Sequence, residues 1–210
     1  MKTDKTTIKR AERTGNPEKE NKTEQEIREK EALGEVLKGG ITAAELLEAA
    51  AKAGENAYAP YSRFRVGAAL LSETGKIYTG CNVESASFSP TCCAERTARC
   101  KAGSEGERRF AAVAVIGRTE GKTQFGPCPP CGVCRQLLRE FCDETFRVIL
   151  AAGDEKDGKF RFAKVKEWTL GELLPQSFGA SSWEISEQSA DKSRENGKGC
   201  GKTKEGAQAR

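Results

Sequence analysis

The sequence predicts an α/β protein in which five strands form one sheet and helices cover its faces. Segments with helical periodicity alternate with short apolar runs of strand length, as is typical of such folds. Of the 14 aromatic residues, 13 lie between residues 41 and 180. By contrast, 19 of the first 40 residues and 11 of the last 30 are charged, and such segments cannot bury enough apolar surface to fold. We therefore expect one domain over 41–180, flanked by charged, disordered extensions over 1–40 and 181–210.

The expected elements follow one another in the order α-β-β-α-β-α-β-β-α. The first helix begins at a capping box, in which Thr42 is followed three residues later by Glu45. A turn over 73–76 joins the first two strands into a hairpin. The expected helices cover 43–57, 93–102, 131–140 and 169–174, and the expected strands cover 65–71, 76–82, 110–117, 146–151 and 159–165.

Nine cysteines and no histidine limit the chemistry that this chain can perform. The absence of histidine excludes Ser-His-Asp triads and Cys-His dyads, and it excludes zinc sites with histidine ligands. The remaining groups for catalysis are cysteine, acidic residues, lysine, tyrosine or a metal held by thiolates.

Charge and hydropathy argue against two kinds of partner, nucleic acids and membranes. The net charge is +4, of which only +2 falls within residues 41–180, so no concentrated basic face for a nucleic acid is expected. No run of about 20 apolar residues is present, so we expect no membrane span. The N-terminus lacks the apolar core of a secretory signal. By elimination we expect a cytoplasmic protein, in which cysteines bind metal, catalyse or pack rather than form disulfides.

Two cysteine clusters carry the chemical signal, TCCAER over 91–96 and CPPCGVCRQ over 128–136. Both lie at expected helix starts, where backbone N–H groups and the helix dipole stabilise thiolates. A Cys-x-x-Cys pair places two sulfurs on one side of the first helical turn, a spacing that suits zinc. Three thiolates with an open position form a catalytic zinc site, whereas four form a closed structural one.

Charged residues beside the cysteines suggest how such a site works. Zinc with three thiolates carries a net negative charge, which weakens its effect on a bound water. We expect Arg96 and Arg135 to donate hydrogen bonds to the sulfurs and so to restore the acidity of that water. Glu95, two residues past Cys93, is expected beside the open position as a proton carrier.

Other cysteines leave two alternatives open. Cys128, Cys131 and Cys134 form a run that suits an iron–sulfur cluster, although Glu95 would have no role beside one. A fourth sulfur from Cys92 or Cys128 would close the zinc site. The cysteines expected to be buried packing residues are Cys81, Cys100 and Cys142, and Cys200 lies in the C-terminal extension.

Five runs of this sequence closely resemble the small homotetrameric cytidine deaminases over about residues 41–180. They are APYSxFxVGAAL (59–70), GCNVESA (80–86), CAERTA (93–98), PCGVCRQ (130–136) and ELLPxxF (172–178). The resemblance implies a three-layer α/β/α fold with a five-stranded mixed sheet. It also implies one Zn²⁺ per subunit, held by Cys93, Cys131 and Cys134, with Glu95 as the proton shuttle.

The same resemblance implies substrate contacts at five positions. Asn82 and Glu84 match the pair that hydrogen-bonds the ribose hydroxyl, and Phe64 matches the ring that lines the pyrimidine pocket. The backbone of Ala94 matches a polar contact to the base. Phe178 matches an aromatic residue that closes the site of a neighbouring subunit, which implies a homotetramer with shared active sites.

The implied activity is hydrolytic deamination of cytidine and 2′-deoxycytidine to uridine and 2′-deoxyuridine in pyrimidine salvage. A deaminase of the blasticidin S type is an alternative, although Phe64 and the Asn82-x-Glu84 pair favour cytidine. A non-catalytic zinc-stabilised interaction module with four thiolates is a second alternative. A polynucleotide-editing deaminase is a third, which the near-neutral charge of residues 41–180 argues against.

Overall fold

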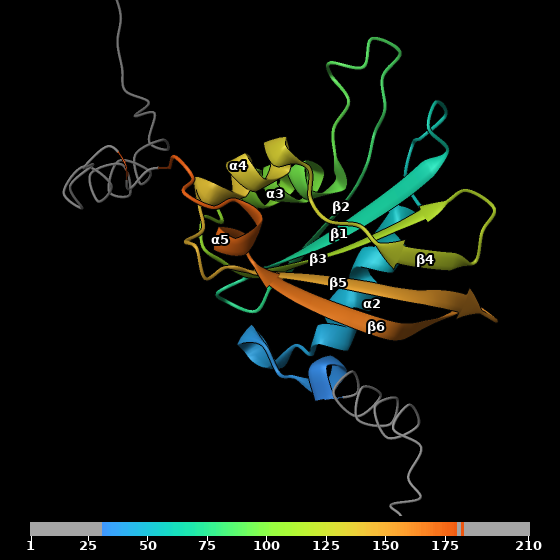
Figure 1. Ribbon diagram of the computed structural model, residues 1–210, viewed down its shortest axis with the longest axis horizontal. Helices are drawn as coiled ribbons and strands as arrows, with labels where there is room; N and C mark the ends of the chain where they lie inside the picture. Colours follow the sequence, from blue (N-terminus) through green and yellow to red (C-terminus); the bar gives the residue numbers. More distant parts are fainter. Residues whose placement is uncertain (1–30, 180–181, 183–210) are drawn as a thin grey trace, which may run out of the picture.

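The computed structural model describes residues 31–179 and residue 182. The strands are β1 (Phe64–Ser72), β2 (Ile77–Cys81), β3 (Phe110–Thr119), β4 (Gln124–Pro127), β5 (Arg147–Lys156) and β6 (Lys159–Thr169). These six strands form one sheet in the order β2-β1-β3-β4-β5-β6 (Figure 1). Neighbours in this order pair antiparallel, and β3 also pairs in parallel with β5. The expected mixed sheet is therefore confirmed, but it has six strands rather than five.

The strand that sequence analysis missed is β4. It is four residues long, and Phe125 is its one buried residue. It pairs through two residues with β3 and through two with β5. A segment this short, containing glycine and proline, carries no alternating apolar pattern, so periodicity does not reveal it.

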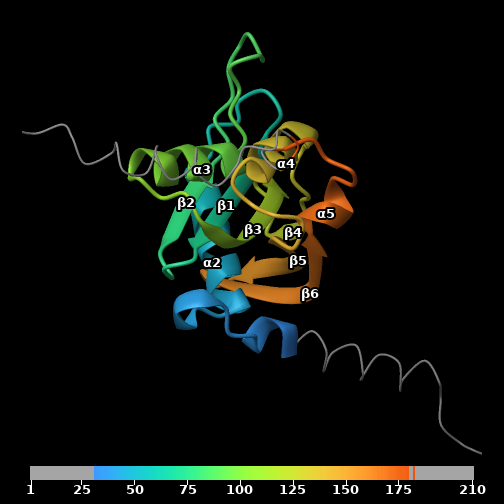
Figure 2. The ribbon, with the colours of Figure 1, turned by 90° about the vertical axis from the view of Figure 1, so that its left-hand side faces the viewer.

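Helices lie on both faces of the sheet. They are the 3-10 helix η1 (Lys38–Gly40) and the α-helices α2 (Ala43–Gly54), α3 (Ala94–Ser104), α4 (Gly132–Arg139) and α5 (Leu170–Leu173). Within β3, Val113 and Val115 pack in one apolar cluster with residues of α3 and α4, whereas Ala112 and Ala114 pack in a second cluster with residues of α2. The expected three-layer arrangement is thus confirmed, with α3 and α4 on one face and α2 on the other (Figures 1 and 2).

Helix α2 begins where the capping box predicts. The Oε2 atom of Glu45 accepts a hydrogen bond from the backbone N–H of Thr42 at 2.8 Å, and Thr42 Oγ1 accepts one from the backbone N–H of Glu45 at 3.2 Å. Two donors at the helix start are satisfied reciprocally. None of the helices within residues 31–179 is long and apolar enough to cross a lipid bilayer.

Residues 31–40 depart from the expected disordered extension. Leu33 and Leu37 pack against the apolar cluster of α2. Glu35 forms an ion pair with Arg147 at 2.6 Å, and the η1 lysine, Lys38, pairs with a glutamate of the β1–β2 turn at 3.0 Å. Composition averaged over 1–40 hides this short docked segment, and the folded unit begins before residue 41. The rest of the two predicted extensions, except residue 182, lies outside the described residues.

Three cysteines outside the two clusters were expected to be buried packing residues. Cys142 is buried and Cys81 is half-buried, but Cys100 is exposed. The buried residues of α3 include Ala94, Ala98 and Ala102, which repeat every four residues, so position 100 falls on the opposite face of the helix. Cys200 lies outside the described residues.

The contact between α2 and β1 depends on a glycine. A Cβ atom on Gly67 would lie 1.9 Å from the carbonyl oxygen of Ala50 and 2.4 Å from the backbone nitrogen of Gly54. We expect Gly67→Ala to lower the free energy of unfolding by about 3 kcal/mol, because two backbones would have to separate. Urea unfolding followed by circular dichroism measures this. Gly126→Ala in β4 is the control, since nothing lies within 4 Å of its Cβ position. Equal losses in the two variants would contradict this account of the packing.

Candidate active site

Three cysteine sulfurs meet at the N-terminal ends of two helices. Cys93 is the N-cap residue of α3 and Cys131 is the N-cap residue of α4, with Cys134 in the first turn of α4. The three Sγ atoms lie within 4.8 Å of one another. The distance from Cys93 Sγ to Cys131 Sγ is 3.8 Å, and the distance from Cys131 Sγ to Cys134 Sγ is 3.6 Å. The structure therefore brings together the three cysteines that the sequence analysis assigned to zinc.

The donor set and its spacing fit zinc. Two sulfurs bound tetrahedrally at about 2.3 Å from one ion are separated by roughly 3.8 Å, close to the distances between these sulfurs. Within the described residues, the group of candidate ligands at this place comprises three sulfurs and no fourth. Three protein ligands leave one position open, which is the arrangement of catalytic zinc rather than structural zinc.

The two neighbouring cysteines take other positions. The backbone of Cys92 pairs with that of Val83, and its sulfur accepts a hydrogen bond from Thr97 Oγ1 at 3.5 Å. Cys128 is half-buried, and desolvation raises the pKa of its thiol to about 11. Neither sulfur belongs to the metal-ligand group found among the described residues. This geometry gives no support to a closed four-thiolate site or to an iron–sulfur cluster.

Serine substitutions distinguish the three candidate metal ligands from the neighbouring Cys92 and Cys128. We expect Cys128→Ser and Cys92→Ser each to retain one zinc per chain, because the three converging sulfurs are left intact. Metal analysis of the purified variants measures the stoichiometry. Loss of zinc from either variant would show that its sulfur reaches the ion.

A hydrogen bond links the thiols of Cys93 and Cys134 and moves their pKa values in opposite directions. A hydrogen bond with Cys134 lowers the pKa of Cys93 to about 6. The same hydrogen bond, together with burial, raises the pKa of Cys134. The first thiolate therefore forms at Cys93, beside the N-terminal end of α3, where the helix dipole favours a negative charge. A divalent cation that replaced the thiol protons would be held by three thiolates.

Glu95 supplies a buried carboxyl group beside the sulfurs. It lies in the first turn of α3 and is 5% exposed. Burial raises its pKa, because desolvation disfavours the ionised form. Desolvation and then the charge of Glu95 raise the pKa of Cys128, and the same charge opposes the lowering of the Cys93 pKa, as expected of a carboxylate near both sulfurs. A carboxyl group with a raised pKa next to a metal site is suited both to take up and to release a proton.

Arg96 and Arg135 were expected to donate hydrogen bonds to sulfur, but among the described residues their hydrogen bonds go to carbonyl oxygens. Arg135 donates from Nε to the carbonyl oxygen of Pro130 and from Nη1 to that of Leu173, each at 2.7 Å. Arg96 donates to the carbonyl oxygen of Thr91 at 3.4 Å, and its charge lowers the pKa of Cys93. Carbonyl oxygens are stronger acceptors than thiol sulfurs, so the guanidinium groups hold the backbone that carries the cysteines. Their influence on a bound metal stays a prediction.

Asn82 holds the first residues of β1, and Glu84 holds the segment that precedes this strand. Asn82 Oδ1 accepts from the backbone N–H of Val66 at 2.8 Å, and its Nδ2 donates to the carbonyl oxygen of Phe64 at 2.9 Å. Glu84 Oε2 accepts from the backbone N–H groups of Tyr61 and Ser62 at 3.0 and 3.2 Å. A hydrogen bond from the Ser62 side chain, together with these two backbone donors, lowers the pKa of Glu84. Sequence analysis missed this supporting role, because it depends on backbone partners that spacing does not reveal.

Phe64 lies close to Gly117 and Cys128. A Cβ atom on Gly117 would be 2.8 Å both from the Phe64 ring and from the sulfur of Cys128. Because Cys128 senses the charges of Glu95 and Cys93, this places the ring in the neighbourhood of the metal site. Phe64 is 38% exposed, so part of the ring is free to contact a substrate. Sequence analysis did not identify Gly117, whose missing side chain makes room for the ring.

Ala94 and Phe178 lie in different surroundings. Ala94 is fully buried at the start of α3, directly after the Cys93 ligand. Phe178 is 57% exposed, and its carbonyl oxygen accepts a hydrogen bond from Gln136 Nε2 of α4 at 2.8 Å. The C-terminal segment is thus attached to the helix that carries two of the sulfurs.

The fold and this site define a class of protein. A three-thiolate metal centre with a buried glutamate, built on two helix N-termini over a mixed sheet, is the arrangement of zinc-dependent deaminases. The family model of the cytidine and deoxycytidylate deaminase zinc-binding region matches residues 41–151. The chain belongs to this family, and it is a zinc protein.

Individual relatives agree with this assignment. The chain is 47% identical over 135 residues to a protein named cytidine deaminase from Sporosarcina psychrophila, a match that covers 63% of this chain and 88% of the relative. A cytidine deaminase from Halalkalibacterium halodurans is 45% identical over 137 residues, covering 64% and 92%. The crystal structure of cytidine deaminase from Burkholderia pseudomallei aligns with a TM-score of 0.55 at 45% identity, covering 66% of this chain and 100% of that one.

Proposed function

We propose that this chain hydrolyses cytidine and 2′-deoxycytidine to uridine and 2′-deoxyuridine, with release of ammonia. The observation that carries the proposal is the buried Glu95 carboxyl group beside three converging cysteine sulfurs. The relatives named cytidine deaminase support the choice of nucleoside. Salvage of pyrimidine nucleosides is the matching role.

Glu95 performs the proton transfers. Zinc, when bound by the three thiolates, supplies a Lewis acid that makes a water molecule acidic near neutral pH. Glu95 accepts the first proton of the attacking water and delivers it to N3 of the pyrimidine, which makes C4 electrophilic. After the oxygen has added to C4, Glu95 moves the second proton to the exocyclic amine, and ammonia leaves. One carboxyl group serves as base and then as acid, so the reaction needs no histidine.

The surrounding residues orient the nucleoside. Phe64 offers a partly exposed ring for contact with the base, and the backbone of Ala94 offers a polar group at the start of α3. Glu84 is held in place by two backbone N–H groups and keeps acceptor capacity for a ribose hydroxyl. Asn82 retains one amide hydrogen beyond its bond to Phe64 for the same purpose.

The proposal includes a homotetramer with shared active sites. Exposed aromatic rings gather around Glu84: the backbone of Tyr58 bonds to Glu84, and the rings of Tyr61 and Phe88 lie 5.9 Å apart. Phe88 is 72% exposed and Phe178 is 57% exposed. Exposed apolar groups of this size favour burial against another copy.

Light scattering tests the oligomeric state, and subunit mixing tests the sharing. In a mixed oligomer, a Glu95→Gln subunit contributes an intact Phe178 to the active site of its neighbour. A Phe178→Ala neighbour contributes an intact Glu95 to the same site. Mixtures assembled from the two weakly active variants are expected to regain turnover. A monomer in solution, or no gain on mixing, would contradict this part of the proposal.

We place the enzyme in the cytoplasm. The eight cysteines among the described residues are all free thiols. A reducing compartment keeps thiols free to bind metal, whereas an oxidising one favours disulfides between neighbouring sulfurs.

An assay of the purified chain tests the function. Loss of cytidine absorbance and release of ammonia are measured for cytidine and deoxycytidine, with and without a zinc chelator, and compared with blasticidin S. We expect turnover of both nucleosides that the chelator abolishes. Absence of ammonia release from the zinc-loaded chain would overturn the proposal, and preference for blasticidin S would move the substrate to that alternative. Four protected thiols per zinc would favour a non-catalytic module, and binding of single-stranded oligonucleotides would favour a polynucleotide substrate.

A further inference from the structure

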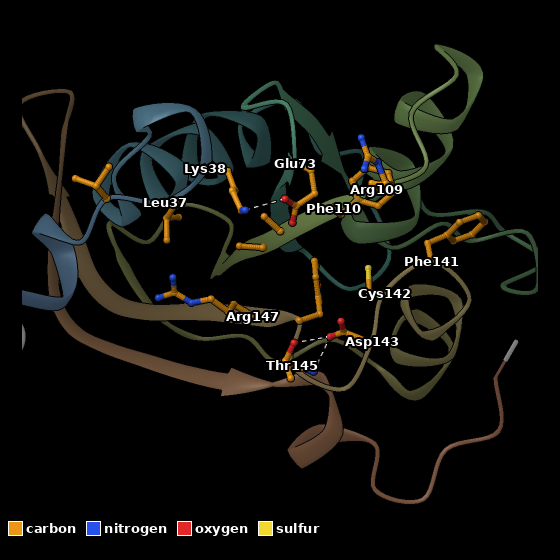
Figure 3. Close-up of a pocket in the computed structure, with 14 residues that line it drawn as sticks. Leu37, Lys38, Glu73, Arg109, Phe110, Phe141, Cys142, Asp143, Thr145 and Arg147 are labelled. Carbon is orange, nitrogen blue, oxygen red and sulfur yellow. Dashed lines mark hydrogen bonds and ion pairs between the residues drawn. The ribbon is translucent and has the colours of Figure 1, made fainter. Parts of the chain in front are cut away.

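A cavity of about 480 Å³ is lined by none of the three cysteines of the metal-ligand group (Figure 3). It is lined by residues of η1, the β1–β2 turn, the start of β3 and the connection from α4 to β5. The C-terminal ends of α3 and α4 lead to this cavity, whereas their N-terminal ends carry the sulfurs. The 11 residues of α3 span roughly 16 Å, so the cavity is separate from the active site.

One wall of the cavity comes from residues outside the family match. Val36, Leu37 and Lys38 line it, whereas the family model begins at residue 41. The ion pairs Lys38–Glu73 and Glu35–Arg147 fix this wall to the domain. The cavity is therefore formed by the deaminase domain together with this chain's own N-terminal segment.

Behind the cavity lies a buried cation without a counter-charge. Arg99 of α3 is 6% exposed, and its Cζ atom lies 3.4 Å from the ring centroid of Phe141 and 5.2 Å from that of Phe110. Both rings line the cavity. The Arg99 Nε atom is buried without a hydrogen-bond partner, and the guanidinium forms no ion pair with any residue of the described part. Burial and the charge of Arg108 lower the pKa of Arg99.

Burial of the Arg99 guanidinium costs free energy in the ligand-free protein. A buried charge is costly unless an opposite charge compensates it, and the stacked rings provide only part of that compensation. The cost falls if an anion binds nearby in the low-dielectric surroundings.

Of the cations that line the cavity, two are paired with carboxylates and a third is not. Lys38 and Arg147 are already paired with carboxylates, and Asp143 accepts two hydrogen bonds from Thr145. Arg109 lies at the edge of the cavity, and its guanidinium forms no hydrogen bond or ion pair within the described part of the chain (Figure 3). The nearby Glu107 carboxylate accepts hydrogen bonds from the backbone N–H groups of Arg108 and Arg109, and these bonds together with the Arg109 charge lower its pKa.

We propose that this cavity binds a small organic anion, with an aromatic or apolar body and one phosphate or carboxylate group. The anionic group lies near Arg109 and compensates Arg99 through the intervening rings. The body rests on Leu37, Phe110 and Phe146. The cavity volume falls within the roughly 300–1,000 Å³ of pockets that hold small organic ligands.

Calorimetry on the zinc-loaded full chain tests the proposal, with saturating uridine present to occupy the active site. The probes are phenyl phosphate and benzoate, which distinguish the two anionic groups, and benzyl alcohol as a neutral control. We expect saturable binding of at least one anion, at least tenfold tighter than that of benzyl alcohol. No saturable binding of either anion, or equal affinity for the alcohol, would overturn the proposal.

Substitutions at Arg109 and Arg99 test whether the anion binds in this cavity. We expect Arg109→Met to weaken the anion at least tenfold, and the matched control Lys122→Met to leave its affinity unchanged. Arg99→Met is expected to weaken binding and to raise the melting temperature of the ligand-free protein, because a buried charge is removed. Unchanged affinity in Arg109→Met would overturn the proposal even if Arg99→Met fails to fold. Binding is measured without turnover, so its failure leaves the proposed deaminase activity standing.

Discussion

Replacing Glu95 with glutamine is expected to lower kcat by about 10³- to 10⁴-fold while the protein keeps its zinc. Glutamine preserves the shape of the side chain but neither accepts nor delivers a proton, and both proton transfers of the proposed mechanism use this carboxyl group. The side chain is buried, so no solvent base replaces it at the same place. Because the three sulfurs are unchanged, the metal stays bound.

Two measurements and one control define this result. Steady-state kinetics with cytidine give kcat, and metal analysis gives the zinc content of the same sample. Glu48→Gln applies the same change to an exposed glutamate of α2 and is expected to leave both values unaltered. Turnover retained by the Glu95 variant would remove Glu95 from the proton transfers. Loss of zinc would instead give it a role in holding the metal.

Replacing Cys134 with alanine is expected to lower zinc affinity by more than about 100-fold and to reduce turnover to background. A change in residues that only support metal ligands already costs about 10- to 100-fold in affinity, and loss of a ligand costs more. Cys134 is fully buried, so no other side chain reaches the vacated position without rearrangement. The two remaining sulfurs lie on different helices and hold the ion less firmly.

Cys142→Ala is the matched control for this experiment. Cys142 is also a buried cysteine, it lies just beyond the end of the same helix, and burial raises its thiol pKa to about 12. It lies outside the metal-ligand group, so its replacement is expected to keep one zinc per chain. Titration with a chromogenic chelator measures the affinities of both variants. Equal zinc affinity in the two would mean that Cys134 is not a ligand.

The sequence predicts the main elements of the fold because they carry regular patterns. The alternation of Val113 and Ala114 between two apolar clusters is typical of a strand buried on both faces, and the Thr42 capping box predicts the start of α2. Strand β4 lacks any such pattern, and its place depends on β3 and β5 on either side. The docked residues before position 41 were missed for a similar reason, since the pairing of Glu35 with Arg147 joins residues 112 positions apart.

The candidate site was predictable to the extent that local motifs encode it. The Cys-x-Glu and Cys-x-x-Cys spacings identify the three sulfurs and Glu95, which the structure brings together. The partners of Arg135 were not predictable, because its hydrogen bond to Leu173 spans 38 positions. Hydrogen bonds to distant backbone atoms follow from the assembled fold, and spacing along the chain does not contain them.

The metal centre joins two parts of the chain that are distant in sequence. Cys93 and Cys131 are 38 positions apart, and β3 and β4 lie between them. An ion bound to both closes this segment into a loop and so acts as a reversible cross-link. A covalent link across a loop of this length would restrict the unfolded chain by roughly 4 kcal/mol. Zinc bound at this site would therefore restrain the chain as a cross-link does, and loss of the ion would weaken the whole domain along with its chemistry.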